Sequence, residues 1–222
     1  MRFQDAARDG RAVVYTGNQA DPLVTRAADL LASADQAERI MARAVMNGEA
    51  TDPTAWMAMF PTLFGPDRLG PGRARSDAVL AVALGVAERG EAVRSQFRGA
   101  IVEELTARML ARRVGTGAVR RERRILFDGV RAEIHPYDVT VERDGGPEAY
   151  DCKWGARGIS DDVLHQLDDA RGHADDEGAA LRTSLVVFDT IRSCEVRLSR
   201  SSAPTDGTTI VALETLDTLA AT

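Results

Sequence analysis

The strongest constraint on the fold of this chain is a hairpin signal near residue 145. Asp144-Gly145 is a dipeptide typical of two-residue type I′ turns, and it separates two strand-like segments, 132–142 and 148–154. A two-residue turn fixes which residues of the two strands lie opposite each other. A slip by one residue would turn every side chain to the other face. The sequence therefore predicts an antiparallel hairpin of defined register.

This register gathers charged side chains on one face of the hairpin. Counting outward from the turn places Asp138 opposite Asp151, in the closer kind of pair, with Cβ atoms roughly 4.5–5.5 Å apart. Lys153 follows Asp151 by two residues and therefore shares its face. The opposite face is expected to collect apolar side chains: Tyr137, Val139, Val141, Tyr150, Cys152 and Trp154.

Two directly opposed carboxylates repel each other, and a divalent cation removes that repulsion. Hard oxygen ligands favour Mg²⁺ or Mn²⁺. The 28 Lys and Arg residues include a single lysine, Lys153, beside these carboxylates. A compact ammonium suits the positioning of water or the neutralisation of charge on a phosphate, so the group indicates metal-assisted phosphodiester hydrolysis. The alternative is a solvent-facing hairpin in which Lys153 simply pairs with a carboxylate.

The segments around the hairpin predict a regular order of elements. They carry the patterns of a helix, a strand, the hairpin, a helix and a strand, at 95–113, 124–128, 132–154, from Ser160 onward and at 184–189. Residues 1–90 are expected to be mainly helical and residues 91–222 to form the second region. Further expectations are a strand at 11–15, one helix over 21–48, a helix from Ser76, and strands at 194–198 and 209–213.

Asp138, the hairpin and then Asp151-Cys152-Lys153 resemble the motif of the PD-(D/E)xK nuclease superfamily. The expected element order over about residues 95–190 resembles the αβββαβ core of the restriction-endonuclease-like fold. The resemblance implies an α/β protein whose mixed central sheet is flanked by helices, with an added N-terminal helical region. One departure is Tyr137, which stands where the motif usually has proline.

The resemblance also implies a role for each residue of the motif. Asp138 and Asp151 would bind Mg²⁺ or Mn²⁺, joined by the backbone carbonyl of Cys152. Lys153 would activate or position the attacking water.

Residues outside the hairpin are expected to support this site. Glu103, in the sequence Gly99-Ala-Ile-Val-Glu103, matches the glutamate that the superfamily often carries on the preceding helix, and would help to hold the metal. The helix pattern alone does not separate it from Glu104, and one of the two is expected to be a solvated charge. Gln166 is an additional candidate, with a surface position as the simpler expectation; it lacks the tyrosine four residues later that the exonuclease branch shows.

A basic segment borders the predicted site. Between residues 108 and 131 the chain has eight arginines and two acidic residues, whereas its total net charge is −6. Arginine matches phosphate geometry, so this segment is expected to follow a nucleic-acid backbone, with a solvated charged face as the alternative. The candidate nucleic-acid-binding residues are Arg112, Arg113, Arg120, Arg121, Arg123 and Arg124.

These expectations favour a Mg²⁺-dependent nuclease that acts on DNA in preference to RNA, similar to small effectors of restriction or antiviral defence. A non-catalytic nucleic-acid-binding or assembly subunit of the same fold is the alternative, and a hydrolase of smaller nucleotides is a third hypothesis. A homodimer or a partner protein would supply recognition. No apolar run reaches the ~20 residues of a membrane span, and the two cysteines lack disulfide-scaffold or zinc spacing, so a cytoplasmic protein is expected.

Overall fold

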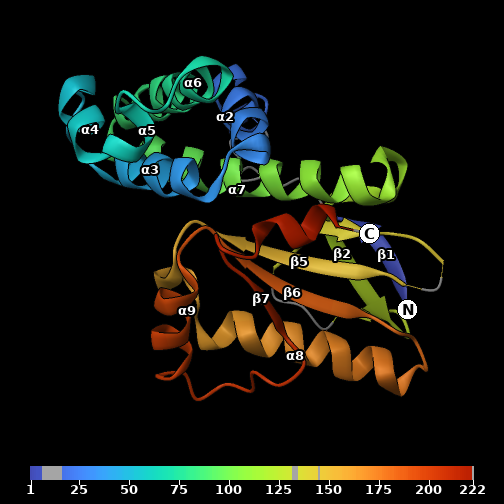
Figure 1. Cartoon of the computed structure of the whole chain (residues 1–222). Coiled ribbons are helices and arrows are strands. Elements are labelled where there is room, and N and C mark those ends of the chain that lie inside the picture. Colours follow the sequence, from blue (N-terminus) through green and yellow to red (C-terminus); the bar gives the residue numbers. More distant parts are fainter. Residues whose placement is uncertain (7–16, 132–134, 145, 222) are drawn as a thin grey trace. The chain divides into compact units, whose positions relative to one another are not determined.

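The computed structural model describes residues 1–6, 17–131, 135–144 and 146–221 (Figure 1). The chain divides into two compact units, one formed by Gly10–Leu105 and the other by Met1–Asp9 with Thr106–Thr222. The division falls inside helix α7 (Glu91–Val114), later than the boundary expected near residue 90, and the start of the chain belongs to the second unit. The strand expected at 11–15 lies outside the described residues.

The first unit is helical, as the sequence predicts. Its helices are α2 (Pro22–Ser33), α3 (Gln36–Asn47), α4 (Pro53–Met59), α5 (Pro61–Phe64), α6 (Gly70–Ala87) and the N-terminal part of α7. Both α2 and α3 contact α6. Apolar side chains such as Leu31, Met41 and Val79 are fully buried there and form the core of this unit.

Two expected helix boundaries in this unit are wrong. The single helix expected over 21–48 is two helices, because Asp35 caps the start of α3. Its carboxylate accepts from the Glu38 amide at 2.9 Å, while the Glu38 carboxylate accepts from the Asp35 amide at 2.9 Å, which is a capping box. Helix α6 begins at Gly70 rather than at Ser76, whose buried hydroxyl donates to Glu38 at 2.8 Å.

The part of the second unit that the structure describes is built on a seven-stranded mixed sheet (Figure 1). The strands are β1 (Arg2–Asp5), β2 (Val119–Phe127), β3 (Val130–Arg131), β4 (Tyr137–Val141), β5 (Glu148–Lys153), β6 (Arg182–Val187) and β7 (Thr209–Val211). Their order is β1-β2-β4-β5-β6-β7, and β3 pairs with β2. Neighbours from β1 to β5 are antiparallel, whereas β5, β6 and β7 are parallel, so the unit has a mixed α/β fold.

The remaining helices of this unit are α8 (Asp161–Asp176), α9 (Ile191–Leu198) and the short 3₁₀ segments η1 (Thr116–Ala118), η2 (Ala156–Gly158) and η3 (Leu216–Ala220). Ser160 caps α8, as predicted, by accepting from the Val163 amide at 3.4 Å. The strand expected at 194–198 is wrong, because this segment is α9. The Thr190 hydroxyl caps that helix by accepting from the Ser193 amide at 3.2 Å.

Helices pack against both faces of this sheet. On one face the Cys152 thiol of β5 donates a hydrogen bond to the Thr106 hydroxyl of α7 at 3.5 Å. On the other face α8 packs in a buried apolar cluster that includes Leu185 of β6 and also Tyr137 of β4. The Tyr137 hydroxyl donates to the Gln166 carbonyl of α8 at 3.4 Å. Tyr137 therefore faces α8, and the expectation that it shares a face with Cys152 is wrong.

The predicted hairpin register is confirmed. Val139 pairs with Tyr150, and Val141 pairs with Glu148, as a two-residue turn at 144–145 requires. The same register places Asp138 of β4 opposite Asp151 of β5. None of the helices among the described residues is long and apolar enough to cross a lipid bilayer.

Candidate metal and catalytic site

Asp138, Asp151 and Lys153 come together at the ends of β4 and β5. Asp151 is buried, and its carboxylate forms an ion pair with the Lys153 ammonium. Asp138 accepts a hydrogen bond from the Cys152 amide at 2.6 Å, so its carboxylate lies directly beside β5. Burial lowers the pKa of Lys153, but the charges of Asp151 and Asp138 together raise it above its ordinary value. Both carboxylates therefore act on one ammonium.

A third carboxylate, that of Glu122 in β2, lies near Asp138. It was not predicted from the sequence. The pairs Arg121–Val139 and Arg123–Tyr137 enclose Glu122 and Asp138 on neighbouring strands. An oxygen of Glu122 and an oxygen of Asp138 lie within 4.8 Å of each other. Burial raises the pKa of Glu122, and the charge of nearby Arg124 opposes that shift.

Glu122 has an unusual backbone for a strand residue. Its φ angle is 51°, in the left-handed region that side chains other than glycine seldom adopt. Such strained residues gather at functional sites, where the surrounding structure maintains them. The available sequence signal was a lone acidic residue within the run Val-Arg-Arg-Glu-Arg-Arg of 119–124.

The stem of Lys153 is confined by its surroundings. A Cβ atom at Gly158 would lie 3.0–3.1 Å from three carbons of the Lys153 side chain, so the absence of a side chain at Gly158 leaves room for that stem. The Lys153 carbonyl accepts from the Phe188 amide at 2.8 Å, and the Trp154 ring stacks on the Phe188 ring at 5.0 Å between centroids. Asp189 then accepts from the Ala156 amide at 3.0 Å, which fixes the turn after β5.

Gln166 is buried, contrary to the simpler expectation of a surface position. Its side-chain oxygen accepts from the His135 amide at 3.1 Å, and its amide nitrogen donates to the His135 carbonyl at 3.1 Å. The side chain thus clamps the peptide that leads into β4. Asp138 follows this clamped peptide by three residues.

Replacing Gln166 with alanine should lower the free energy of unfolding by about 1–3 kcal/mol, because two buried backbone groups lose their partner. Urea unfolding measures this loss, with His165→Ala on the exposed side of α8 as the control. A loss no larger than that of the control would contradict a stabilising role of this clamp.

Glu103 and Glu104 lie on α7 and are both buried, so the expectation that one of them is a solvated charge is wrong. Glu103 accepts from the Gln19 side chain at 2.6 Å within the helical unit. The predicted role of Glu103 at the metal stays a prediction.

The predicted nucleic-acid-binding arginines differ in their surroundings. Arg113 pairs with the Glu148 carboxylate at 2.5 Å, and Arg123 pairs with Glu142 at 2.6 Å and also with Asp5, so both are engaged within the unit. The other four remain candidates: Arg112 and Arg120 are exposed, and Arg121 and Arg124 are half-buried.

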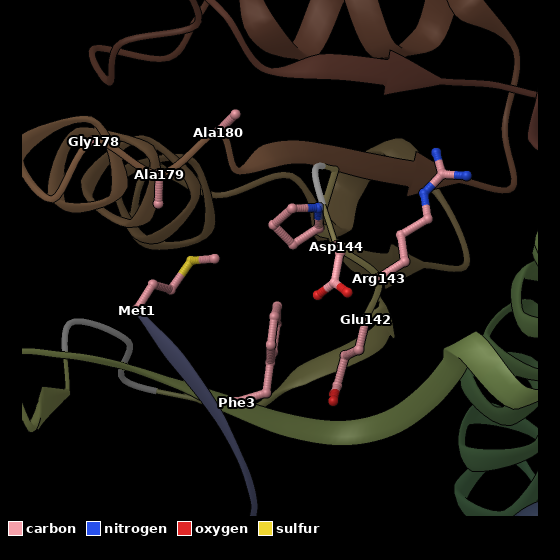
Figure 2. Close-up of a pocket in the computed structure, with 9 residues that line it drawn as sticks. Met1, Phe3, Glu142, Arg143, Asp144, Gly178, Ala179 and Ala180 are labelled. Atoms are coloured by element: carbon pink, nitrogen blue, oxygen red, sulfur yellow. The ribbon is translucent and has the colours of Figure 1, made fainter.

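A cavity of about 630 Å³ lies at the opposite, turn-bearing end of the hairpin (Figure 2). Met1 and Phe3 of the β1 segment, Glu142 and Asp144 beside the turn, and the loop at 178–180 surround it. Asp138, Asp151 and Lys153 do not line this cavity. The cavity is therefore separate from the cluster formed by Asp138, Asp151 and Lys153.

Comparisons with known proteins bear on the fold. No family model and no curated protein matches the chain. The crystal structure of protein VC1899 from Vibrio cholerae is similar, with a TM-score of 0.51 and 15% sequence identity. The alignment covers 99% of this chain and 56% of VC1899, so the chain spans about half the length of that protein. The similarity supports the mixed α/β architecture.

Proposed function

We propose that this chain is a metal-dependent nuclease with a restriction-endonuclease-like core. The observation that carries the proposal is that Asp138, Asp151 and the chain's single lysine, Lys153, lie together at one end of a hairpin. A buried carboxylate beside a second carboxylate is costly unless a cation compensates it. The lysine compensates in part, and the remaining negative charge favours a further cation.

The donor set fits a hard divalent ion. Carboxylate oxygens from Asp138, Asp151 and Glu122 suit Mg²⁺ or Mn²⁺, which take few protein carboxylates and keep several waters. The Cys152 carbonyl is proposed as a further ligand from the resemblance. When bound, the ion would stabilise the negative charge that develops on the phosphoryl oxygens.

Glu103 is proposed as a further ligand from the resemblance, which often has a glutamate on the helix that precedes the hairpin.

Lys153 has two tasks in this proposal. Its ammonium, oriented by Asp151 and by the confined stem over Gly158, donates hydrogen bonds to the attacking water and to the phosphate. Asp138 and Asp151 orient the same ammonium through charge. The exposed arginines Arg112 and Arg120 would contact phosphates of the substrate backbone.

DNA in preference to RNA is the proposed substrate, and a role in restriction or antiviral defence is proposed by analogy of fold. The second candidate is a non-catalytic nucleic-acid-binding or assembly subunit. The engagement of Arg113 and Arg123 in ion pairs favours it, because fewer arginines remain available for a substrate backbone. A partner or a second copy of the chain would supply sequence recognition in either case.

The test incubates supercoiled plasmid, linear duplex, single-stranded DNA and RNA with the full chain, in Mg²⁺, in Mn²⁺ and in EDTA. We expect cleavage of DNA that requires the metal and stops in EDTA. Asp151→Asn should abolish it, while the exposed Asp176→Asn on α8 should cleave like the wild type. Retention of nucleic acid without cleavage in either metal would favour the non-catalytic subunit.

A further inference from the structure

A second cavity, of about 380 Å³, opens where β7 stops pairing with β6. Strand β7 pairs with Ser184 to Val186, whereas Arg182 and Thr183 of β6 pair with β5 alone. Arg113 of α7, Arg171 of α8 and Thr183 all line this cavity. Asp138, Asp151 and Lys153 are not among its lining residues, so it is separate from the proposed catalytic site.

Three residues that line this cavity each carry a buried polar atom without a hydrogen-bond partner among the described residues. These atoms are the Thr183 hydroxyl oxygen, Nε of Arg113 and Nη1 of Arg171. Thr183 is only 2% exposed. A buried donor without an acceptor costs free energy, and most buried polar groups avoid that state. Each of these groups can donate a hydrogen bond. The cavity therefore lacks hydrogen-bond acceptors for them.

The two guanidinium groups are held in place by other contacts. Arg113 donates to Glu148 at 2.5 Å and to the Tyr150 hydroxyl at 3.3 Å. Arg171 forms an ion pair with Asp168 and lies against Gly207, whose φ angle is 80°. A Cβ atom at Gly207 would come within 2.3 Å of Arg171 Nη1, so a side chain at this position would displace the guanidinium from its present place.

The charge of the lining also favours an anion. Arg113, Arg171 and Arg182 face a single lining carboxylate, Glu148. That carboxylate is already engaged by Arg113, by Arg182 at 2.6 Å and by the Tyr150 hydroxyl. An excess of positive charge therefore surrounds the three unpartnered donors.

We propose that this cavity binds a phosphate group, either free or carried by a small phosphate monoester. The phosphate oxygens would accept from Arg113 Nε, Arg171 Nη1 and the Thr183 hydroxyl, which supplies the missing acceptors. The volume lies within the range of small-molecule pockets, about 300–1,000 Å³, which leaves room for the organic part of a monoester. The sources of that phosphate are a mononucleotide, a sugar phosphate or free inorganic phosphate.

Isothermal titration of the full chain with AMP, glucose 6-phosphate and inorganic phosphate tests the proposal and separates these sources. We expect binding that Thr183→Val weakens about tenfold or more, because a hydrogen bond to a charged group is lost. Arg171→Gln should weaken it at least as much, while the exposed Arg200→Gln should bind like the wild type.

Thermal unfolding without ligand separates a binding role from a structural one. Thr183→Val removes a hydroxyl that has no partner in the free protein, so its melting temperature should equal or exceed that of the wild type. Failure of all three compounds to bind up to millimolar concentration would overturn the proposal. Unchanged affinity in Thr183→Val, or a lowered melting temperature with unchanged affinity, would overturn it as well. These results are independent of cleavage at Asp138 and Asp151.

Discussion

Lys153→Ala is expected to lower metal-dependent DNA cleavage by roughly 10²–10³-fold, the usual cost of removing one donor that stabilises transition-state charge. The ammonium pairs with Asp151, and the charge of Asp138 also acts on it. Lys153 is the only lysine of the sequence. Initial rates on plasmid DNA in Mg²⁺ measure the effect, and circular dichroism confirms that the variant folds.

Lys153→Arg should also lose most of the activity. A planar guanidinium holds its donors in a fixed fork and does not reproduce the compact ammonium that pairs with Asp151. Arg200→Ala, on the exposed surface, is the matched control and should cleave like the wild type. Cleavage that persists in Lys153→Ala would show that the catalytic ammonium has been assigned wrongly.

Glu38→Ala is expected to produce the largest loss of stability, about 3–5 kcal/mol in the free energy of unfolding. Glu38 is fully buried and accepts from Arg68 at 2.8 Å, from Arg75 at 2.7 Å and from Ser76 at 2.8 Å. It also accepts from the Asp35 amide at 2.9 Å to close the capping box of α3. Its removal takes this carboxylate away from Arg68 and Arg75 and also breaks the capping box of α3.

Urea unfolding followed by tryptophan fluorescence measures this loss. The two tryptophans lie in different units, so a Trp154→Phe background leaves Trp56 to report on the helical unit. Asp77→Ala is the control, because the partly exposed Arg73–Asp77 pair contributes at most about 1 kcal/mol. A loss from Glu38→Ala as small as that of the control would mean that the carboxylate network does not stabilise this unit.

The sequence predicted the hairpin well because its register depends on local information. The Asp144-Gly145 turn sets the count, and the alternation of side chains on the flanking strands agrees with it at each confirmed pair. The cap at Ser160 is local in the same way. Local information of this kind is enough to bring Asp138, Asp151 and Lys153 to one end of the hairpin.

The errors concern features that depend on distant contacts. Glu122 reaches the site through a left-handed backbone and a neighbouring strand, which no local pattern reveals. Tyr137 turns toward α8 and bonds to the Gln166 carbonyl, against the alternation expected for β4. Segment 194–198 has apolar residues suited to a strand, yet the Thr190 cap and packing of Cys194 in the core make it a helix.

The most direct test of the central claim is a Mn²⁺ titration followed by electron paramagnetic resonance, which needs neither substrate nor partner. The wild type should bind Mn²⁺, and Mg²⁺ should compete for the same site. The double variant Asp138→Asn/Asp151→Asn should lose this binding while it keeps its circular dichroism spectrum. Mn²⁺ binding that the double variant retains, or its absence from the wild type, would contradict a metal site at these carboxylates.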